Sequence, residues 1–212
     1  MQSSSKPGSI RRIAGLGVAA ILIVFAVAAV VKGLDGHATV SSALSQEKVV
    51  GTPDMTPAAI AAKAGQAGVQ NLTAPACSVA GKQITSGADA RCFAEYMRVD
   101  ALIATGGKTY AQMPRFATKD HKGTNDPAAA LTYPNGEPMN NPAREVWVTE
   151  TAMSTALNTS YMAEQISLFG TAVGAVLGLL GLILGLYCAA GLQLPARAER
   201  VVRERVPEPS AA

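Results

Sequence analysis

Histidine is scarce in this chain, and the sequence motifs of common enzymes are missing. Only two histidines, His37 and His121, occur among 212 residues. The patterns HExxH, GxSxG, CxxC and the Walker loop are absent. Residues 120–126, DHKGTND, lack the ligand spacing of a calcium loop. We therefore expect no catalytic residues, no metal site and no cofactor, and we predict that the protein is not an enzyme.

Charged and aromatic side chains are also few, at 16% and 5% of the residues, which is unlike a large soluble core. The net charge is only +3, and no run of lysine and arginine is interleaved with aromatics. Binding to nucleic acid is therefore not expected.

Two long stretches carry no charge at all. Nineteen uncharged residues separate Arg12 from Lys32, and thirty-two separate Glu164 from Arg197. A helix needs about 20 apolar residues to cross a bilayer. We predict transmembrane helices over 13–32 and 166–194.

The first apolar stretch has a second interpretation, as a cleaved signal peptide. Such a peptide also has a basic start and an apolar centre, and Ala26-Val27-Ala28 resembles a cleavage motif. However, the apolar run continues through Val31, which favours an uncleaved span.

Basic residues at the ends of the spans indicate the orientation. Lysine and arginine precede the first span and follow the second, whereas none lies in the fifteen residues before Ile166. Because positive charge stays on the cytoplasmic side, we expect tails 1–12 and 195–212 in the cytoplasm. Residues 33–165 then form one extracytoplasmic domain of a plasma-membrane protein.

The three cysteines fit this orientation. Cys77 and Cys92 lie fifteen residues apart in the outer segment, and Cys188 lies near the inner end of the second span. In an oxidising compartment the first two are expected to form a disulfide. A metal-binding pair is the alternative, but no further cysteine or nearby histidine completes a tetrahedral site. Cys188 is expected to stay a free thiol.

Capping residues mark two helix starts in the outer segment. Thr56 before Pro57, and Asn141 before Pro142, are typical of an N-cap and a first helical position. No glycine or proline follows Pro142 until Gly170, so one long helix is expected to continue into the second span. A short helix is expected over 40–50.

The clearest amphipathic pattern covers 87–107. Phe93 and Tyr96 lie on its apolar half, and Gly106 and Gly107 should end the helix. Asp100 breaks the pattern, either as a carboxylate paired with a lysine or a backbone amide, or as a buried ligand or proton-handling group.

A polar segment, 117–141, is expected to form a long loop. The part of the long helix that comes after this loop carries an imperfect apolar stripe of Val146, Met153 and Leu157, with Glu150 and Glu164 near the same face. Trp147 is expected to pack on the domain.

Glycines recur every third or fourth residue in the second span. Lipid supplies no hydrophobic force between helices, so small residues that allow close approach promote their packing. The partner of this face is either the first span, with Gly15, Ala19 and Ala26, or another protein. The glycines of the predicted packing face are Gly170, Gly174, Gly178, Gly181 and Gly185.

The motifs ALIATGGKTYAQM (101–113) and NPAR (141–144), before a helix that enters a glycine-rich span, resemble an uncharacterised actinobacterial family of two-span membrane proteins. The resemblance covers mainly 90–113 and 141–190. This chain has Asp100 where relatives have a histidine, and 116–140 resembles an insertion. Some members carry the label of an aromatic ring-opening dioxygenase. A non-haem iron site needs two histidines and a carboxylate, and His37 and His121 lie on unrelated segments, so that activity is not expected.

Together these features predict a mainly α membrane protein. It has two transmembrane helices, a small helical, disulfide-linked extracytoplasmic domain and a long helix continuing into the second span. The leading functional hypothesis is a non-enzymatic accessory or scaffold protein that lies in the lipid bilayer. It binds another membrane or extracytoplasmic protein through its extracytoplasmic domain, or a protein partner or a second copy through the glycine-rich span. The alternative is an extracytoplasmic ligand-binding or sensor module with a pocket around Tyr96, Asp100 and Tyr110, acting through a partner chain.

Overall fold

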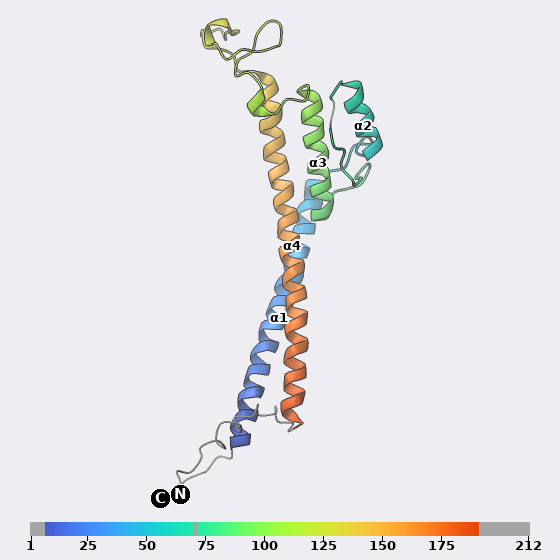
Figure 1. Ribbon diagram of the computed structural model, residues 1–212, viewed down its shortest axis with the longest axis vertical. Helices are drawn as coiled ribbons and strands as arrows, with labels where there is room; N and C mark the ends of the chain where they lie inside the picture. The colour runs from blue at the N-terminus through green and yellow to red at the C-terminus, as the bar shows by residue number, and fades with distance from the viewer. Residues whose placement is uncertain (1–6, 70–71, 191–212) are drawn as a thin grey trace, which may run out of the picture. The chain divides into compact units, whose positions relative to one another are not determined.

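The computed structural model describes residues 7–69 and 72–190, which form four α-helices and no β-strand (Figure 1). The mainly helical fold is therefore confirmed. The expected C-terminal tail with its arginines and residues 1–6 of the N-terminal tail lie outside the described residues. The helices are α1 (Pro7–Glu47), α2 (Pro57–Gln66), α3 (Gly87–Ala104) and α4 (Pro142–Ala189), with 3-10 turns at Tyr110–Gln112 and Pro127–Ala129.

The described chain divides into two compact units. Residues 7–32 of α1 and 170–190 form one, which we call the hairpin unit. Residues 33–169 form the other, which contains α2, α3 and the disulfide, and which we call the disulfide unit. Both α1 and α4 are long and apolar enough to cross a membrane.

Helix α1 is longer than the sequence suggested. It begins within the expected tail 1–12, runs through the expected span 13–32 and ends only at Glu47, so the separate short helix over 40–50 is wrong. Gly36 packs directly on the side chain of Ser167, and His37 Nδ1 lies 3.2 Å from Glu164 Oε1. These contacts offset the cost of glycine in a helix, about 1 kcal/mol.

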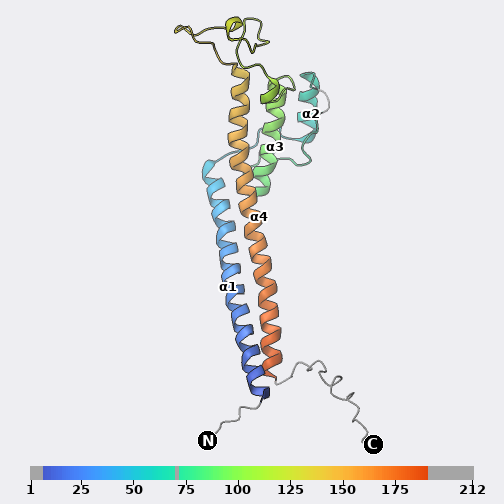
Figure 2. The same cartoon turned by 60° about the vertical axis from the view of Figure 1, so that its left-hand side comes forward.

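Helix α4 begins where its capping residues predicted. The Ala143 N–H donates to Asn141 Oδ1 at 3.1 Å, and Pro142 takes the first helical position. Since no further proline interrupts the sequence between Pro142 and Ala189, α4 is a single helix over this whole range (Figure 2).

Helices α2 and α3 are also capped by local side chains. The Ala59 N–H donates to Thr56 Oγ1 at 3.2 Å, as the Thr56-Pro57 pair predicted. Ser86 caps α3, which ends before Gly106 and Gly107, both with positive φ (61° and 78°). These two glycines are the expected stop.

The core of the disulfide unit lies on the apolar face of α3. Tyr96 is fully buried there, together with Ile60 of α2 and with Val79 and Ile84 of the preceding loop. Leu44, near the end of α1, joins the same cluster.

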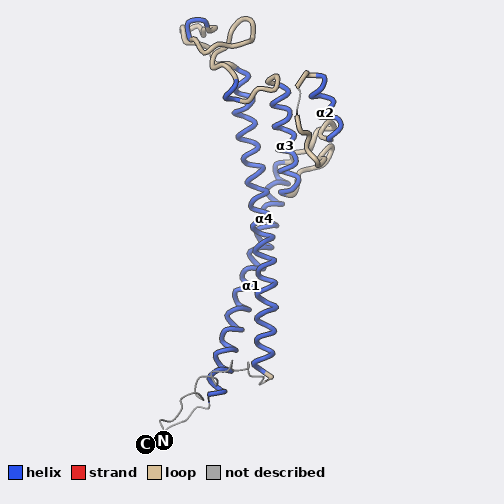
Figure 3. The backbone as a smooth tube through the Cα atoms, viewed as in Figure 1, coloured by secondary structure: helices blue, strands red, loops and turns tan. Residues whose placement is uncertain are grey.

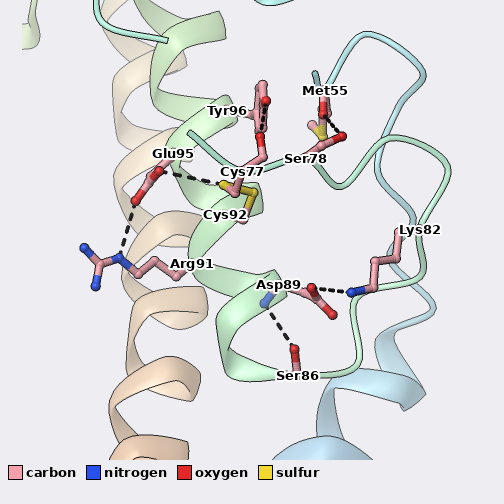
Figure 4. The surroundings of a disulfide bond; sticks show 10 residues. All are labelled: Met55, Cys77, Ser78, Lys82, Ser86, Asp89, Arg91, Cys92, Glu95 and Tyr96. Carbon is pink, nitrogen blue, oxygen red and sulfur yellow. Dashed lines mark hydrogen bonds and ion pairs between the residues drawn. A yellow bond between two sulfur atoms is a disulfide. The ribbon is translucent and has the colours of Figure 1, made fainter. Parts of the chain in front are cut away.

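The disulfide joins Cys77 to Cys92, with their Cα atoms 6.1 Å apart, and confirms the predicted pairing (Figure 4). Cys92 lies in the second turn of α3, so the bridge holds the loop before α3 against the start of that helix. Cys188 is a free, buried thiol, as expected.

The segment 117–141 is a loop that contains the 3-10 turn Pro127–Ala129 (Figure 3). Its backbone is extensively hydrogen-bonded. The Ala117 N–H donates to Met139 O at 2.9 Å, and the Leu131 N–H donates to Ala117 O at 2.9 Å. Phe116 forms isolated β-bridges with both Thr124 and Asn140. The loop therefore returns to its starting point with a defined conformation.

Candidate functional site

Tyr96, the first residue of the predicted pocket, is a core residue. Its side chain is 0% exposed, and its hydroxyl donates to Cys77 O at 2.6 Å (Figure 4). Burial, followed by the nearby Glu95 carboxylate, raises the pKa of the Tyr96 phenol. Its role in the structure is to fix the Cys77 backbone against α3.

Asp100 pairs with a lysine, which is the first of the two interpretations open from the sequence. Lys63 Nζ on α2 lies 2.6 Å from Asp100 Oδ1 and 2.9 Å from Asp54 Oδ2. The hydrogen bond to Asp100, and then that to Asp54, raise the pKa of Lys63. The hydroxyl of Thr52, and then Lys63, lower the pKa of Asp54. This cluster joins α2 to α3.

Tyr110 lies in a different environment from Tyr96 and Asp100. It is 45% exposed, and the guanidinium carbon of Arg144 lies 3.8 Å from the centre of its ring. It borders a shallow groove with Trp147 and Val148, whereas Asp100 borders a second groove. The structure therefore does not bring Tyr96, Asp100 and Tyr110 together around one cavity.

The second groove lies between α3 and α4 and has a volume of about 600 Å³. Its apolar lining includes Met97, Ala101 and Val146, and its charged lining residues are Asp100, Glu145 and Glu150, all acidic. We call it the acidic groove. Sequence reasoning missed it, because its two walls come from helices that are about 40 residues apart in the chain.

The buried face of α4 in the disulfide unit agrees only in part with the predicted stripe. Leu157 is partly buried and packs against the core, but Val146 and Met153 are exposed. Trp147, Glu150 and Glu164 are buried. The Trp147 indole N–H donates to Lys108 O at 2.9 Å, which agrees with the expected packing of this residue on the domain. The buried and half-buried residues of this face recur at alternating spacings of three and four, at positions 147, 150, 154, 157, 161 and 164. Two of them are carboxylates, so a search for apolar residues alone does not define the face.

Glu164 lies where three helices meet within the disulfide unit. It is buried, pairs with His37 of α1 and packs on Gly87, the first residue of α3. A Cβ at Gly87 would lie 2.7 Å from the Cα of Tyr161 and 2.8 Å from Glu164 Oε2. Glycine is therefore required for this close approach of α3 to α4.

Within the hairpin unit, the glycines of α4 face α1. A Cβ at Gly174 would lie 2.9 Å from Ala26 O and 3.0 Å from Val30 N, and one at Gly181 would lie 3.2 Å from Ala19 O. Gly170, Gly178 and Gly185 also have atoms of α1 as their nearest neighbours, at 3.4–3.9 Å. All five glycines of the predicted packing face therefore approach α1 of the same chain.

At the end of the hairpin unit, a glycine of α1 packs against a side chain of α4 instead. A Cβ at Gly15 of α1 would lie 2.5 Å from the Cys188 Sγ of α4. Nearby, Arg12 Nη2 donates to Ala189 O at 2.8 Å. A cation at the C-terminus of a helix is favourable, because the last carbonyls have no partner within the helix.

In the part of the chain that the structure describes, no three histidine, cysteine, aspartate or glutamate side chains are grouped so that they could hold a metal ion. Comparisons of the sequence with protein-family models and curated proteins, and of the structure with solved structures, find no match. The geometry is therefore the basis for a functional proposal.

Proposed function

We propose that this chain is a non-enzymatic integral membrane protein that crosses the plasma membrane twice and serves as an accessory or scaffold for another protein. Its spans are 13–32 and 166–194, both termini are cytoplasmic, and 33–165 lies outside. The similarity of its motifs to the actinobacterial two-span family is in keeping with this proposal.

The distribution of small and large residues in the hairpin unit supports the proposal that this unit lies in a membrane. Small residues lie between the two helices, among them Ala19, Ala26 and Gly174. Large apolar side chains point away, with Phe25 64% exposed and Leu186 71% exposed. In water the hydrophobic effect favours the reverse arrangement. A lipid environment solvates the outer side chains and leaves close packing over small residues to join the helices.

The orientation can be tested by labelling single introduced cysteines in intact cells. We expect a membrane-impermeant maleimide to modify a cysteine placed at Thr124 and to spare one placed at Ser210. The physical reason is that the basic residues beside both spans remain cytoplasmic. Mass-tag gel analysis gives the labelled fraction, and permeabilised cells provide the control in which both positions react. Labelling at Ser210 but not at Thr124 would reverse the topology.

The loop 117–141 supports the part of the proposal that concerns a protein partner. Most of its residues are solvent-exposed, including Tyr133 at 42%, although backbone hydrogen bonds fix its course. Long loops with a defined conformation are uncommon in compact domains unless they have a function. The glycine face already contacts α1, so a partner is more readily accommodated at this loop.

The partner proposal predicts a complex that depends on the loop. After cross-linking in cells and extraction in a mild non-ionic detergent, we expect the full chain to migrate in a discrete assembly larger than one copy. A variant with 118–138 replaced by a short Gly/Ser linker should lose that assembly, because the contact surface is removed. Native-gel migration and mass spectrometry of the cross-linked band provide the measurement. Recovery of the monomer alone from the unaltered chain would contradict the proposal.

A further inference from the structure

Glu150 is a buried carboxylate whose charge has no partner among the described residues. The residue is 5% exposed and lies in the ninth position of α4, too far from the helix N-terminus to be stabilised by its dipole. Its hydrogen bond comes from the Thr151 hydroxyl at 3.4 Å, which is long for a hydroxyl and a carboxylate. Burial of an ionised carboxylate is costly unless a cation compensates it.

Three cations of the disulfide unit contact groups other than Glu150. Lys63 is shared between Asp54 and Asp100. The guanidinium carbon of Arg98 lies over the Trp147 ring, 5.3 Å from its centre, and that of Arg144 lies over Tyr110. The ion pairs of the described chain include none to Glu150.

Glu150 lines the acidic groove, so a compensating cation can reach it from solvent. The groove's volume of about 600 Å³ falls in the range of small-molecule sites. Its apolar walls include Met97, Ala104 and Val146, and none of its lining residues is basic. Of its three carboxylates, Asp100 is paired with Lys63 and Glu145 is exposed, so Glu150 is the buried one without a cation. Apolar walls around one such carboxylate suit a ligand that has a hydrocarbon part and a single cationic end.

We propose that the acidic groove binds a small organic cation of the primary alkylammonium class. The ammonium group pairs with the Glu150 carboxylate, and the alkyl chain lies on the apolar wall formed by Met97 and Ala104. Glu145, which is exposed at the edge of the groove, adds to its negative potential. A bare metal ion fits less well, since the groove offers no group of three ligating side chains. This proposal does not depend on membrane insertion or on a protein partner.

The single tryptophan of the chain reports on this site, because Trp147 lies one helical turn before Glu150. We expect n-hexylammonium, added to the full-length protein in non-ionic detergent, to change Trp147 fluorescence in a saturable manner. 1-Hexanol has the same alkyl chain and partitions into micelles, but it has no charge and should not reproduce the change. Equal responses to the two compounds would overturn the proposal.

Two variants locate the site. Glu150→Gln keeps the shape of the side chain and should weaken n-hexylammonium binding at least about tenfold, because a charge-assisted interaction is lost. Glu137→Gln makes the same charge change on an exposed loop residue and should leave the affinity unaltered. If Glu150→Gln does not fold, Ala104→Leu supplies the test, since it occupies the groove from an exposed position. Wild-type affinity in a folded Glu150→Gln protein, or in Ala104→Leu when only that variant folds, would overturn the proposal.

Discussion

Replacement of Cys92 by serine is expected to lower the free energy of unfolding of the disulfide unit by about 2–5 kcal/mol. The bridge closes a loop over a sequence separation of 15 residues, and it removes conformational freedom from the unfolded chain. It also positions the Cys77 carbonyl that accepts the Tyr96 hydrogen bond, so core packing at Tyr96 is affected as well. Thermal unfolding of the full chain in detergent, followed by circular dichroism, measures the change.

Cys188→Ser is the matched control, since it removes a cysteine that forms no disulfide. Its effect on the disulfide unit should be small by comparison. Mass spectrometry without reductant provides an independent check of the pairing. Free alkylation of Cys77 in the unreduced native protein would contradict the bridge and would weaken the case for an extracytoplasmic location.

Replacement of Gly174 by leucine is expected to destabilise the packing of α1 on α4 in the hairpin unit by about 1–3 kcal/mol. The nearest atoms to the new Cβ include Ala26 O and Val30 N, which are backbone atoms and cannot move aside as a flexible side chain can. The two helices must therefore separate locally. Unfolding in mixed detergent micelles with increasing dodecyl sulfate measures the loss.

Gly17→Leu provides a control that is not expected to destabilise the hairpin unit. Nothing lies within 4 Å of a Cβ at Gly17, although this residue belongs to α1 in the same unit. Because leucine has the higher helix propensity, the control should be neutral or slightly stabilising. Equal destabilisation by both variants would show that glycine at position 174 has no specific packing role.

The local features of the fold could be predicted from the sequence. Thr56 and Asn141 cap their helices through their own side chains, and Gly106 and Gly107 end α3 through their positive φ values. Each of these signals acts over a few residues, so their spacing along the chain is sufficient. The disulfide could also be predicted, because only Cys77 and Cys92 lie in the segment for which the charge pattern predicts an extracytoplasmic location.

Features that depend on distant residues could not be predicted in the same way. The partner of Asp100 is Lys63, 37 residues earlier, and no local pattern connects them. The course of α1 through Gly36 depends on contacts with α4 that are more than 100 residues away in sequence. Helix propensity accounts only for the free-energy cost of glycine in a helix, whereas the contacts between α1 and α4 offset that cost. The acidic groove could not be predicted either, because its two walls come from helices that are distant in the sequence.

The contact between Gly15 and Cys188 links the sizes of two residues at opposite ends of the chain. The sulfur atom of Cys188 occupies the volume that any side chain at position 15 would need. A larger residue at either position must therefore be accompanied by a smaller one at the other, if the spacing of the helices is kept. In homologous chains, the side-chain volumes at these two positions should vary inversely, and such covariation would be independent evidence for this helix contact.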